Sequence, residues 1–299
     1  MHKLVRIKKR EHARSSTVCS AMTDISATER PVLFLDSGVG GLPYLRAAAA
    51  ELPSERLVYL ADRSNFPYGE KSPAEVRRAI VAAAGEAISA HEPKAAVVAC
   101  NTASVVALQA LRREFGIPFV GVVPAVKPAA QRSLNRRIGV LATARTVEDR
   151  YLAELIAQFA ADCYVLRVAG GDIVSFVEQR FFVSRAAERR AIVDHAAALF
   201  REAGVDTVVL GCTHFLHVER ELCEALGSAV HVIDSREGVT RRLAALLHEH
   251  QLFRAGPPAE GSLYVTRTAG CDPMRNDDYA CFAEQFQLRY RGALPVRSA

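Results

Sequence analysis

The chain has 299 residues, of which half are apolar and 24% are charged, enough apolar material for the cores of about two domains. No apolar run approaches the roughly 20 residues that a membrane-spanning helix needs, so membrane insertion by such a helix is excluded. The net charge of +5 is concentrated near the start and has no aromatic or motif support for nucleic-acid binding, which we therefore do not expect.

Residues 1–29 are basic and carry no periodic pattern. They also lack the apolar run of about 7–15 residues that follows the basic part of a secretory signal. We expect a disordered, solvated arm and a cytoplasmic protein, with Met22 as an alternative natural start. In a reducing compartment the seven cysteines are not expected to form disulfides, so each is either a small buried apolar residue or a functional thiol.

From residue 30 onward, short β-rich apolar runs alternate with longer amphipathic segments. The expected strands are residues 32–35, 57–61, 95–99, 119–122, 138–141, 163–168, 207–210, 230–233 and 263–266, the last preceded by a linker at 256–262 and followed by a short helix. Ser72, Pro73 and Glu75 form the start signal of a helix, a capping box with proline in the first turn. Such alternation predicts an α/β fold with mainly parallel sheets flanked by helices.

The alternation runs through the chain twice, which predicts two pseudo-symmetric lobes with the active site in the cleft between them. Residues 30–123 and 236–299 are assigned to the first lobe, which carries Cys100. Residues 124–235 are assigned to the second lobe, which carries Cys212. Ligands of such folds bind beyond the carboxyl ends of the strands, so the segments that follow the strands are the candidate site.

Two of these segments repeat one arrangement: Cys100 and Cys212 each follow an apolar strand and precede a helix. A helix N-terminus lowers the pKa of a thiol and favours the thiolate. A single cysteine in this position is more often a core residue, but its repetition in both lobes favours a functional pair. The other five cysteines are interpreted as buried structural residues: Cys19, Cys163, Cys223, Cys271 and Cys281.

Two further kinds of site fit the strand ends less well. The glycine-rich segment after Asp36 lacks the third glycine of a dinucleotide-binding loop, since Pro43 stands there, so nucleotide binding at this loop is not expected. Cys212, His214 and His217 could contribute to a zinc site, but no C-x-x-C pair completes it. We expect no metal and interpret His217 as a solvated helix residue.

Two thiols on opposite faces of an amino-acid Cα can invert its configuration without a cofactor, because one removes the proton and the other returns it. Asp36 near Cys100 and His214 near Cys212 are candidate proton-transfer partners. The helix N-termini that follow Ser37, Thr102 and Thr213 can hold substrate carboxylates.

These motifs resemble those of the glutamate racemases of bacterial cell-wall synthesis and occur in the same order along the chain. The resemblance runs from residue 31 to about residue 270. The blocks that carry the resemblance are Asp36-Ser37-Gly38-Val39-Gly40-Gly41, Pro67-Tyr68-Gly69, Cys100-Asn101-Thr102-Ala103-Ser104, Gly121-Val122-Val123-Pro124-Ala125, Gly211-Cys212-Thr213-His214 and Asp234-Ser235. The resemblance implies interconversion of L- and D-glutamate for peptidoglycan, with Cys100 acting on the D-enantiomer and Cys212 on the L-enantiomer. Leu216 departs from it, since the family often has proline there.

The resemblance also assigns roles to other residues. Substrate-binding or proton-transfer positions are Asp36, Ser37, Pro67, Tyr68, Gly69, Asn101, Thr102, Thr213 and His214. Glu178 is similar to the acidic partner of the second thiol. A nucleotide-linked peptidoglycan precursor is a candidate activator, and the protein is expected to be a monomer or homodimer. Two alternatives stay open: a racemase of aspartate or a related amino acid, and a non-catalytic amino-acid-binding protein, whose expected loss of one thiol is not seen here.

Overall fold

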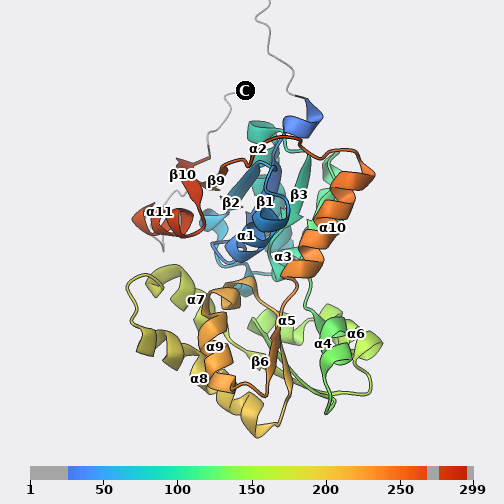
Figure 1. The fold of residues 1–299 in the computed structure, drawn as a ribbon, viewed down its shortest axis with the longest axis vertical. Coiled ribbons are helices and arrows are strands. Elements are labelled where there is room, and N and C mark those ends of the chain that lie inside the picture. Colours follow the sequence, from blue (N-terminus) through green and yellow to red (C-terminus); the bar gives the residue numbers. More distant parts are fainter. Residues whose placement is uncertain (1–25, 268–275, 295–299) are drawn as a thin grey trace, which may run out of the picture.

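The structure is a computed structural model that describes residues 26–267 and 276–294. Their strands form two sheets in which all neighbouring strands run parallel (Figure 1). The first sheet has the order β10-β9-β2-β1-β3-β4, with β1 at Val32–Asp36, β2 at Leu57–Ala61, β3 at Ala95–Val98, β4 at Phe119–Gly121, β9 at Gly261–Val265 and β10 at Leu288–Ala293. The second has the order β6-β5-β7-β8, with β5 at Arg137–Ala142, β6 at Tyr164–Ala169, β7 at Thr207–Leu210 and β8 at His231–Ile233.

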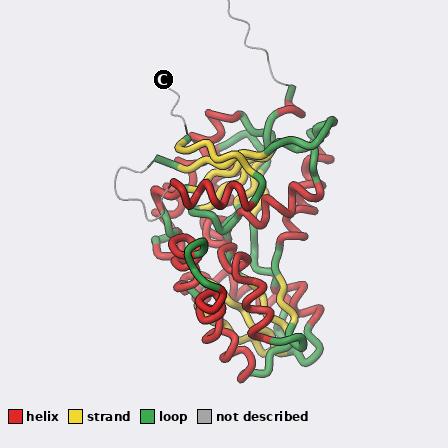
Figure 2. Tube along the Cα trace, turned by 60° about the vertical axis from the view of Figure 1, so that its left-hand side comes forward, coloured by secondary structure: helices red, strands yellow, loops and turns green. Residues whose placement is uncertain are grey.

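Helices cover both faces of each sheet (Figure 2). Those of the first lobe are α1 Leu42–Glu51, α2 Pro73–His91, α3 Asn101–Glu114, α10 Arg236–Glu249 and α11 Asn276–Gln285. Those of the second are α4 Val126–Arg132, α5 Ala144–Glu148, α6 Arg150–Phe159, α7 Gly171–Arg180, α8 Ala186–Glu202 and α9 Glu219–Leu226. Because side chains alternate along a strand, Phe34 packs in one core with α1 and α10, whereas Leu33 and Leu35 pack in another with α2 and α3. Continuous apolar strands are therefore buried on both sides, as the sequence predicts.

The two sheets repeat one topology. Read in chain order within each lobe, the strands β1–β4 and β5–β8 both lie in the spatial order second, first, third, fourth. The strands β3 and β7, which Cys100 and Cys212 follow, are thus equivalent third strands of the two lobes. The chain crosses between the lobes after β4 and again after β8, where the Tyr44 and Ser235 hydroxyls hydrogen-bond at 2.9 Å. The predicted α/β fold of two pseudo-symmetric lobes is confirmed.

Several local expectations are corrected. The last predicted strand begins at Gly261, inside the expected linker, and a further edge strand, β10, is absent from the sequence-based prediction. Its signal is the short alternation of apolar and charged residues that begins at Leu288, which indicates a strand but is easily missed in so short a run. The strand expected at 163–168 lies one residue later, at Tyr164–Ala169. The capping box of Ser72 and Glu75 is confirmed, and α11 supplies the expected short helix.

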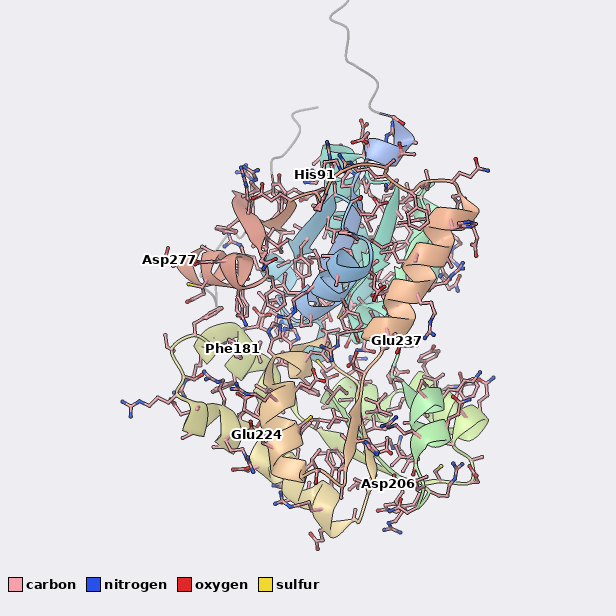
Figure 3. All side chains as sticks on the ribbon, in the orientation of Figure 1. His91, Phe181, Asp206, Glu224, Glu237 and Asp277 are labelled. Atoms are coloured by element: carbon pink, nitrogen blue, oxygen red, sulfur yellow. The ribbon has the colours of Figure 1, made fainter. Side chains whose placement is uncertain are left out.

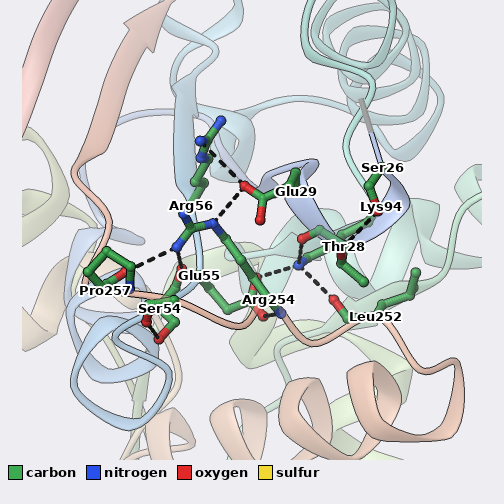
Figure 4. A network of polar contacts seen from close by, with 11 residues as sticks. Ser26, Thr28, Glu29, Ser54, Glu55, Arg56, Lys94, Leu252, Arg254 and Pro257 are labelled. Atoms are coloured by element: carbon green, nitrogen blue, oxygen red, sulfur yellow. Dashed lines mark hydrogen bonds and ion pairs between the residues drawn. The ribbon is translucent and has the colours of Figure 1, made fainter. Parts of the chain in front are cut away.

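Residues 26–29 are not disordered, which corrects their assignment to the basic arm. Ala27–Glu29 forms a turn of 3-10 helix that a buried polar network ties to the first lobe (Figure 4). Lys94 lies at its centre: its ammonium pairs with the Glu55 carboxylate at 2.5 Å and donates to the carbonyl oxygens of Thr28 and Leu252, each at 2.7 Å. Met22 and the rest of the arm lie outside the described residues.

Removing one partner of this ion pair leaves the other buried without its counter-charge. We expect Lys94→Met to lower the free energy of unfolding by about 3–5 kcal/mol, because both side chains are almost fully buried. Urea denaturation measures the loss. Arg150→Met is the matched control, since its pair with Glu154 is exposed and should cost far less. Equal losses in the two variants would contradict this account of the network.

In the described residues, no helix has both the length and the apolar character that crossing a bilayer would require.

Candidate functional site

A cavity of about 170 Å³ lies between the two lobes. Its volume resembles the ~150 Å³ of cavities that hold a benzene-sized molecule, so it suits a small ligand. The walls come from the carboxyl ends of strands in both sheets, as expected for this class of fold. The lining residues are Ser37, Pro67, Tyr68, Gly69, Glu70, Cys100, Asn101, Thr102, Thr143, Ala144, Gly171, Val174, Gly211, Cys212, Thr213 and His214.

Both candidate thiols face this cavity, and each stands at the residue before a helix. Cys100 follows β3, which ends at Val98, and directly precedes α3; only 6% of its surface is exposed. Burial raises the pKa of the Cys100 thiol well above its ordinary value, and the nearby Asp36 carboxylate raises it further. The Ala103 N–H at the start of α3 acts in the opposite direction but is outweighed. The expectation that the helix N-terminus makes Cys100 a thiolate is therefore wrong: burial prevails and the resting form is the thiol.

Asp36 lies at the end of β1, behind the cavity lining, and is buried. Its carboxylate accepts hydrogen bonds from the Ser37 N–H at 2.6 Å and from the Thr213 hydroxyl at 3.2 Å. Burial raises the pKa of Asp36 to about 6, while the positive charge of His214 acts against the rise. Asp36 is thus mostly ionised at neutral pH but is a stronger base than an ordinary carboxylate, and it lies within reach of Cys100.

On the second lobe, Cys212, His214 and Glu178 form a relay. The Cys212 Sγ lies 3.9 Å from the His214 Nδ1, and the His214 Nε2 lies 2.7 Å from the Glu178 Oε1. Since an ionised carboxylate only accepts, Nε2 donates to Glu178. Burial disfavours the charged imidazole, but the hydrogen bonds with Cys212 and Glu178 raise the pKa of His214 well above its ordinary value. His214 is thereby suited to take a proton from Cys212.

The turn that carries Tyr68 and Gly69 is held by a carboxylate that sequence reasoning missed. Asp62 is buried at the end of β2 and accepts from the Tyr68 hydroxyl at 2.6 Å and from the Thr266 hydroxyl at 2.8 Å. The Asn65 amide also donates to Asp62, at 3.0 Å. These bonds fix the edge of the cavity that the turn forms.

Asn101 is a buried residue of the cavity wall, and neither polar atom of its amide has a hydrogen-bond partner. A buried amide without partners costs free energy unless a ligand or water satisfies it. The amide can donate to a carboxylate and accept from an ammonium group, which are the two polar groups on the Cα of an amino acid.

The cavity gathers most of the predicted site residues. Asp36 and Glu178 lie outside its lining, behind Ser37 and His214, and act only through their neighbours. Six lining residues are absent from the sequence-based prediction: Glu70, Thr143, Ala144, Gly171, Val174 and Gly211. Thr143 and Gly171 follow the first and second strands of the second lobe, so they are the counterparts of Ser37 and the Tyr68 turn. The same strand-end rule, applied to every strand of the second lobe, would have found these two.

The remaining cysteines and His217 differ from their predictions. Cys223 and Cys281 are exposed and Cys163 is partly exposed, so they are not buried structural residues; Cys19 and Cys271 lie outside the described residues. His217 is not a solvated residue: its Nε2 donates to the Val39 carbonyl oxygen at 3.1 Å, and three phenylalanine rings surround it. Within residues 26–267 and 276–294, no three His, Cys, Asp or Glu side chains are grouped to hold a metal ion.

The loop after β1 packs so tightly against the second lobe that Gly38 has no room for a side chain. A Cβ there would overlap the Glu178 Oε1. We expect Gly38→Ala to push Glu178 away from His214 and to lower kcat by about tenfold or more, as displacement of a reacting group by an ångström can do. Steady-state rates of the reaction that the resemblance implies measure the loss. Gly116→Ala is the control, since nothing lies within 4 Å of its new Cβ; equal activity of the two variants would contradict the prediction.

Comparisons with known proteins agree with this arrangement. Residues 44–242 match the family described as Asp/Glu/Hydantoin racemase. The chain is 40% identical over 265 residues to a glutamate racemase of Treponema pallidum, covering 88% of this chain and 96% of that protein. It is also similar in structure to the Escherichia coli glutamate racemase in complex with L-glutamate and the activator UDP-MurNAc-ala. The TM-score is 0.78 at 33% identity, and the match covers 90% of this chain and 100% of that one. For a glutamate racemase of Bacillus anthracis the TM-score is 0.77 at 27% identity, with the same coverages. The chain therefore belongs to the Asp/Glu/hydantoin racemase family.

Proposed function

We propose that this protein is a glutamate racemase that moves the α-proton of glutamate between Cys212 and Cys100 without a cofactor. The observation that carries the proposal is that equivalent strand ends of two similar lobes bring one thiol each to a single small cavity. A hydrolase would need one nucleophile, whereas inversion at Cα needs an acid and a base on opposite faces. The names of the relatives at about 40% identity supply the amino acid.

In the direction from L- to D-glutamate, the Cys212 thiolate removes the α-proton from one face. The electron pair of the C–H bond stays on Cα, and the Cys100 thiol gives its proton to the other face. This leaves a Cys212 thiol and a Cys100 thiolate, so the reverse reaction uses the same two groups in exchanged roles. The raised pKa of Cys100 supports the thiol as its resting form and hence its role as the acid in this direction.

The groups behind the thiols restore their protonation states. His214 takes the proton of Cys212, and Glu178 stabilises the resulting imidazolium. Asp36, with a pKa of about 6, takes or returns the proton of Cys100. Each thiol thus has its own proton acceptor, as a reversible two-base reaction requires.

The polar lining holds the substrate in place. We assign the α-ammonium and carboxylate to the unpartnered Asn101 amide and to the hydroxyls and backbone N–H groups at the starts of two helices. Thr102 and Thr213 stand at these helix starts. Ser37 lies in the loop after β1, because α1 begins only at Leu42, which corrects the expected helix N-terminus directly after Ser37. Pro67, Tyr68 and Gly69 also line the cavity, and Asp62 holds the Tyr68 hydroxyl. Fixed dipoles in a buried cavity stabilise the developing carbanion with little reorganisation.

A racemase of aspartate is the nearest alternative, because the same two thiols would serve a shorter substrate. Circular dichroism of L-glutamate and L-aspartate incubated with the purified protein separates the two. Loss of ellipticity with glutamate, at a rate at least a hundredfold above that with aspartate, is the expected result. The reverse preference would overturn glutamate as the substrate, and no change with either would overturn racemisation itself.

We place the reaction in the cytoplasm, where it supplies D-glutamate for peptidoglycan. The activator of the Escherichia coli enzyme is a nucleotide-linked compound of the same kind as the one expected here. The assay above, repeated with UDP-MurNAc-ala, tests whether this chain responds to it. We further assign residues 30–123 with 236–299 to one lobe and 124–235 to the other, in a monomer or homodimer.

A further inference from the structure

His217 is a second histidine of the second lobe, and the mechanism above does not use it. It lies in the 3-10 segment Thr213–Val218, three residues after His214. Three phenylalanine rings surround its imidazole with centroid distances of 5.4–5.8 Å: Phe181, Phe282 of α11 and Phe286, which follows the last residue of α11. Phe181 directly follows α7 and lies toward α11 in Figure 3. Its one polar contact among those described is with Val39 of the opposite lobe.

Val39 is held by the second lobe at both of its backbone groups. Its N–H donates to the Glu178 Oε1 at 2.7 Å, and its carbonyl oxygen accepts from the His217 Nε2 at 3.1 Å. The same Glu178 oxygen accepts from the His214 Nε2. Hydrogen bonds therefore link His217 to the Val39 carbonyl, the Val39 N–H to Glu178, and Glu178 to His214 beside Cys212. The Val39 carbonyl also accepts from the Leu42 N–H at 3.1 Å. The two backbone groups of Val39 are joined through its Cα, so the link through Val39 is one of position.

We propose that His217 is a positioning residue for the second thiol: by holding the Val39 carbonyl, it sets the Val39 N–H that orients Glu178 beneath His214. The inference rests on the proposed racemase function for its catalytic consequence, but its geometric part does not. His217 touches neither the cavity nor a thiol, so it acts only through Val39 and Glu178.

The surroundings of His217 suit it to be a constant donor. Burial lowers the pKa of His217 to about 3, and the positive charges of His214 and Arg46 act in the same direction. The ring is therefore neutral throughout the working pH range. A carbonyl oxygen can only accept, so the single proton of the neutral ring stays on Nε2, and the Nδ1 carries none.

The hydrogen bonds of His217 and Glu178 with Val39 connect the two lobes. Val39 belongs to the first lobe, whereas His217 and Glu178 belong to the second. The bond is thus complete only when the lobes are closed as in this structure, which couples closure to the orientation of His214. Loss of the donor should change proton transfer at Cys212 more than substrate binding.

Two replacements of His217 separate its donor from its bulk. His217→Phe keeps an aromatic ring in the cluster but removes the donor, and we expect kcat to fall about tenfold while KM changes less than twofold. His217→Gln keeps an N–H near the position of Nε2 and should retain at least half of the wild-type kcat. His248→Phe is the matched control, since this exposed histidine also lies against a phenylalanine, Phe253, but outside the site; its kcat should be unchanged.

A second readout does not depend on turnover. In ¹⁵N-histidine NMR spectra, the His214 imidazole should lose part of its raised pKa in His217→Phe and keep it in His217→Gln. Unchanged kcat and unchanged His214 titration in His217→Phe would overturn the proposal. The proposal would also be overturned if kcat fell equally in His217→Phe and His217→Gln, in proportion to a fall in their melting temperatures. That result would indicate a structural role for His217. If the wild-type protein does not racemise glutamate, the proposed function fails, and the NMR titration still decides the role of His217.

Discussion

Replacing either Cys100 or Cys212 with alanine is expected to abolish racemisation in both directions. Each direction needs one thiolate to remove the α-proton and one thiol to return it, so either loss interrupts the same pathway. Removal of a general acid or base costs about 10²–10⁴-fold in rate, and the rate of each variant should fall by at least that much. Circular dichroism with pure L- and pure D-glutamate measures both directions.

The single variants should nevertheless keep half of the chemistry. With a glutamate analogue that carries a leaving group at Cβ, each variant is expected to eliminate it from the enantiomer that its remaining thiol deprotonates. Cys212→Ala, which keeps Cys100, should act on the D-enantiomer, and Cys100→Ala, which keeps Cys212, should act on the L-enantiomer. Cys163→Ala and Cys223→Ala are the controls, because these cysteines lie outside the cavity. Full racemase turnover in Cys100→Ala or Cys212→Ala would defeat the two-thiol mechanism.

Asp36→Asn is expected to slow racemisation about a hundredfold at pH 8 and to change its pH dependence. In the wild-type protein, kcat/KM should fall below about pH 6, because the protonated Asp36 can no longer take the proton of Cys100. The variant has no carboxyl group at this position, so its remaining activity should be nearly flat between pH 5 and 7. A wild-type profile repeated unchanged in the variant would show that another group titrates.

The same substitution is expected to stabilise the fold above pH 6. Because the pKa of Asp36 is raised in the folded protein, the folded state binds more protons than the unfolded state between about pH 4 and pH 6. Ionisation of Asp36 therefore destabilises the wild-type protein as the pH rises through this range. The variant should be more stable by up to about 3 kcal/mol at pH 8 and no more stable near pH 4, as urea denaturation at both values measures. A higher stability at pH 4 than at pH 8, relative to wild type, would contradict the sign.

The sequence by itself determined the class of fold and most of the cavity wall. Continuous apolar strands such as β1 can be stable only when covered on both faces, and parallel strands place their carboxyl ends on one edge. The segments that follow them are therefore predicted to meet, and this rule together with the repeated strand–Cys–helix arrangement identifies Cys100 and Cys212 as a pair. Thr143 and Gly171 also follow strands of the second lobe. They are not predicted because the sequence-based prediction considers only the segments after the other two strands of that lobe.

The tertiary structure alone decided the protonation of the site and the role of His217. The pKa of Cys100 depends on a balance between the helix N-terminus, which is visible in the sequence, and burial beside Asp36, which is not. No sequence pattern around His217 shows whether its side chain is solvated or buried. It is enclosed by α11, which follows about 60 residues later in the chain. Local sequence specifies which elements form, but the desolvation of a side chain and its partners depend on contacts between distant segments, and these exist only once the two lobes are packed together.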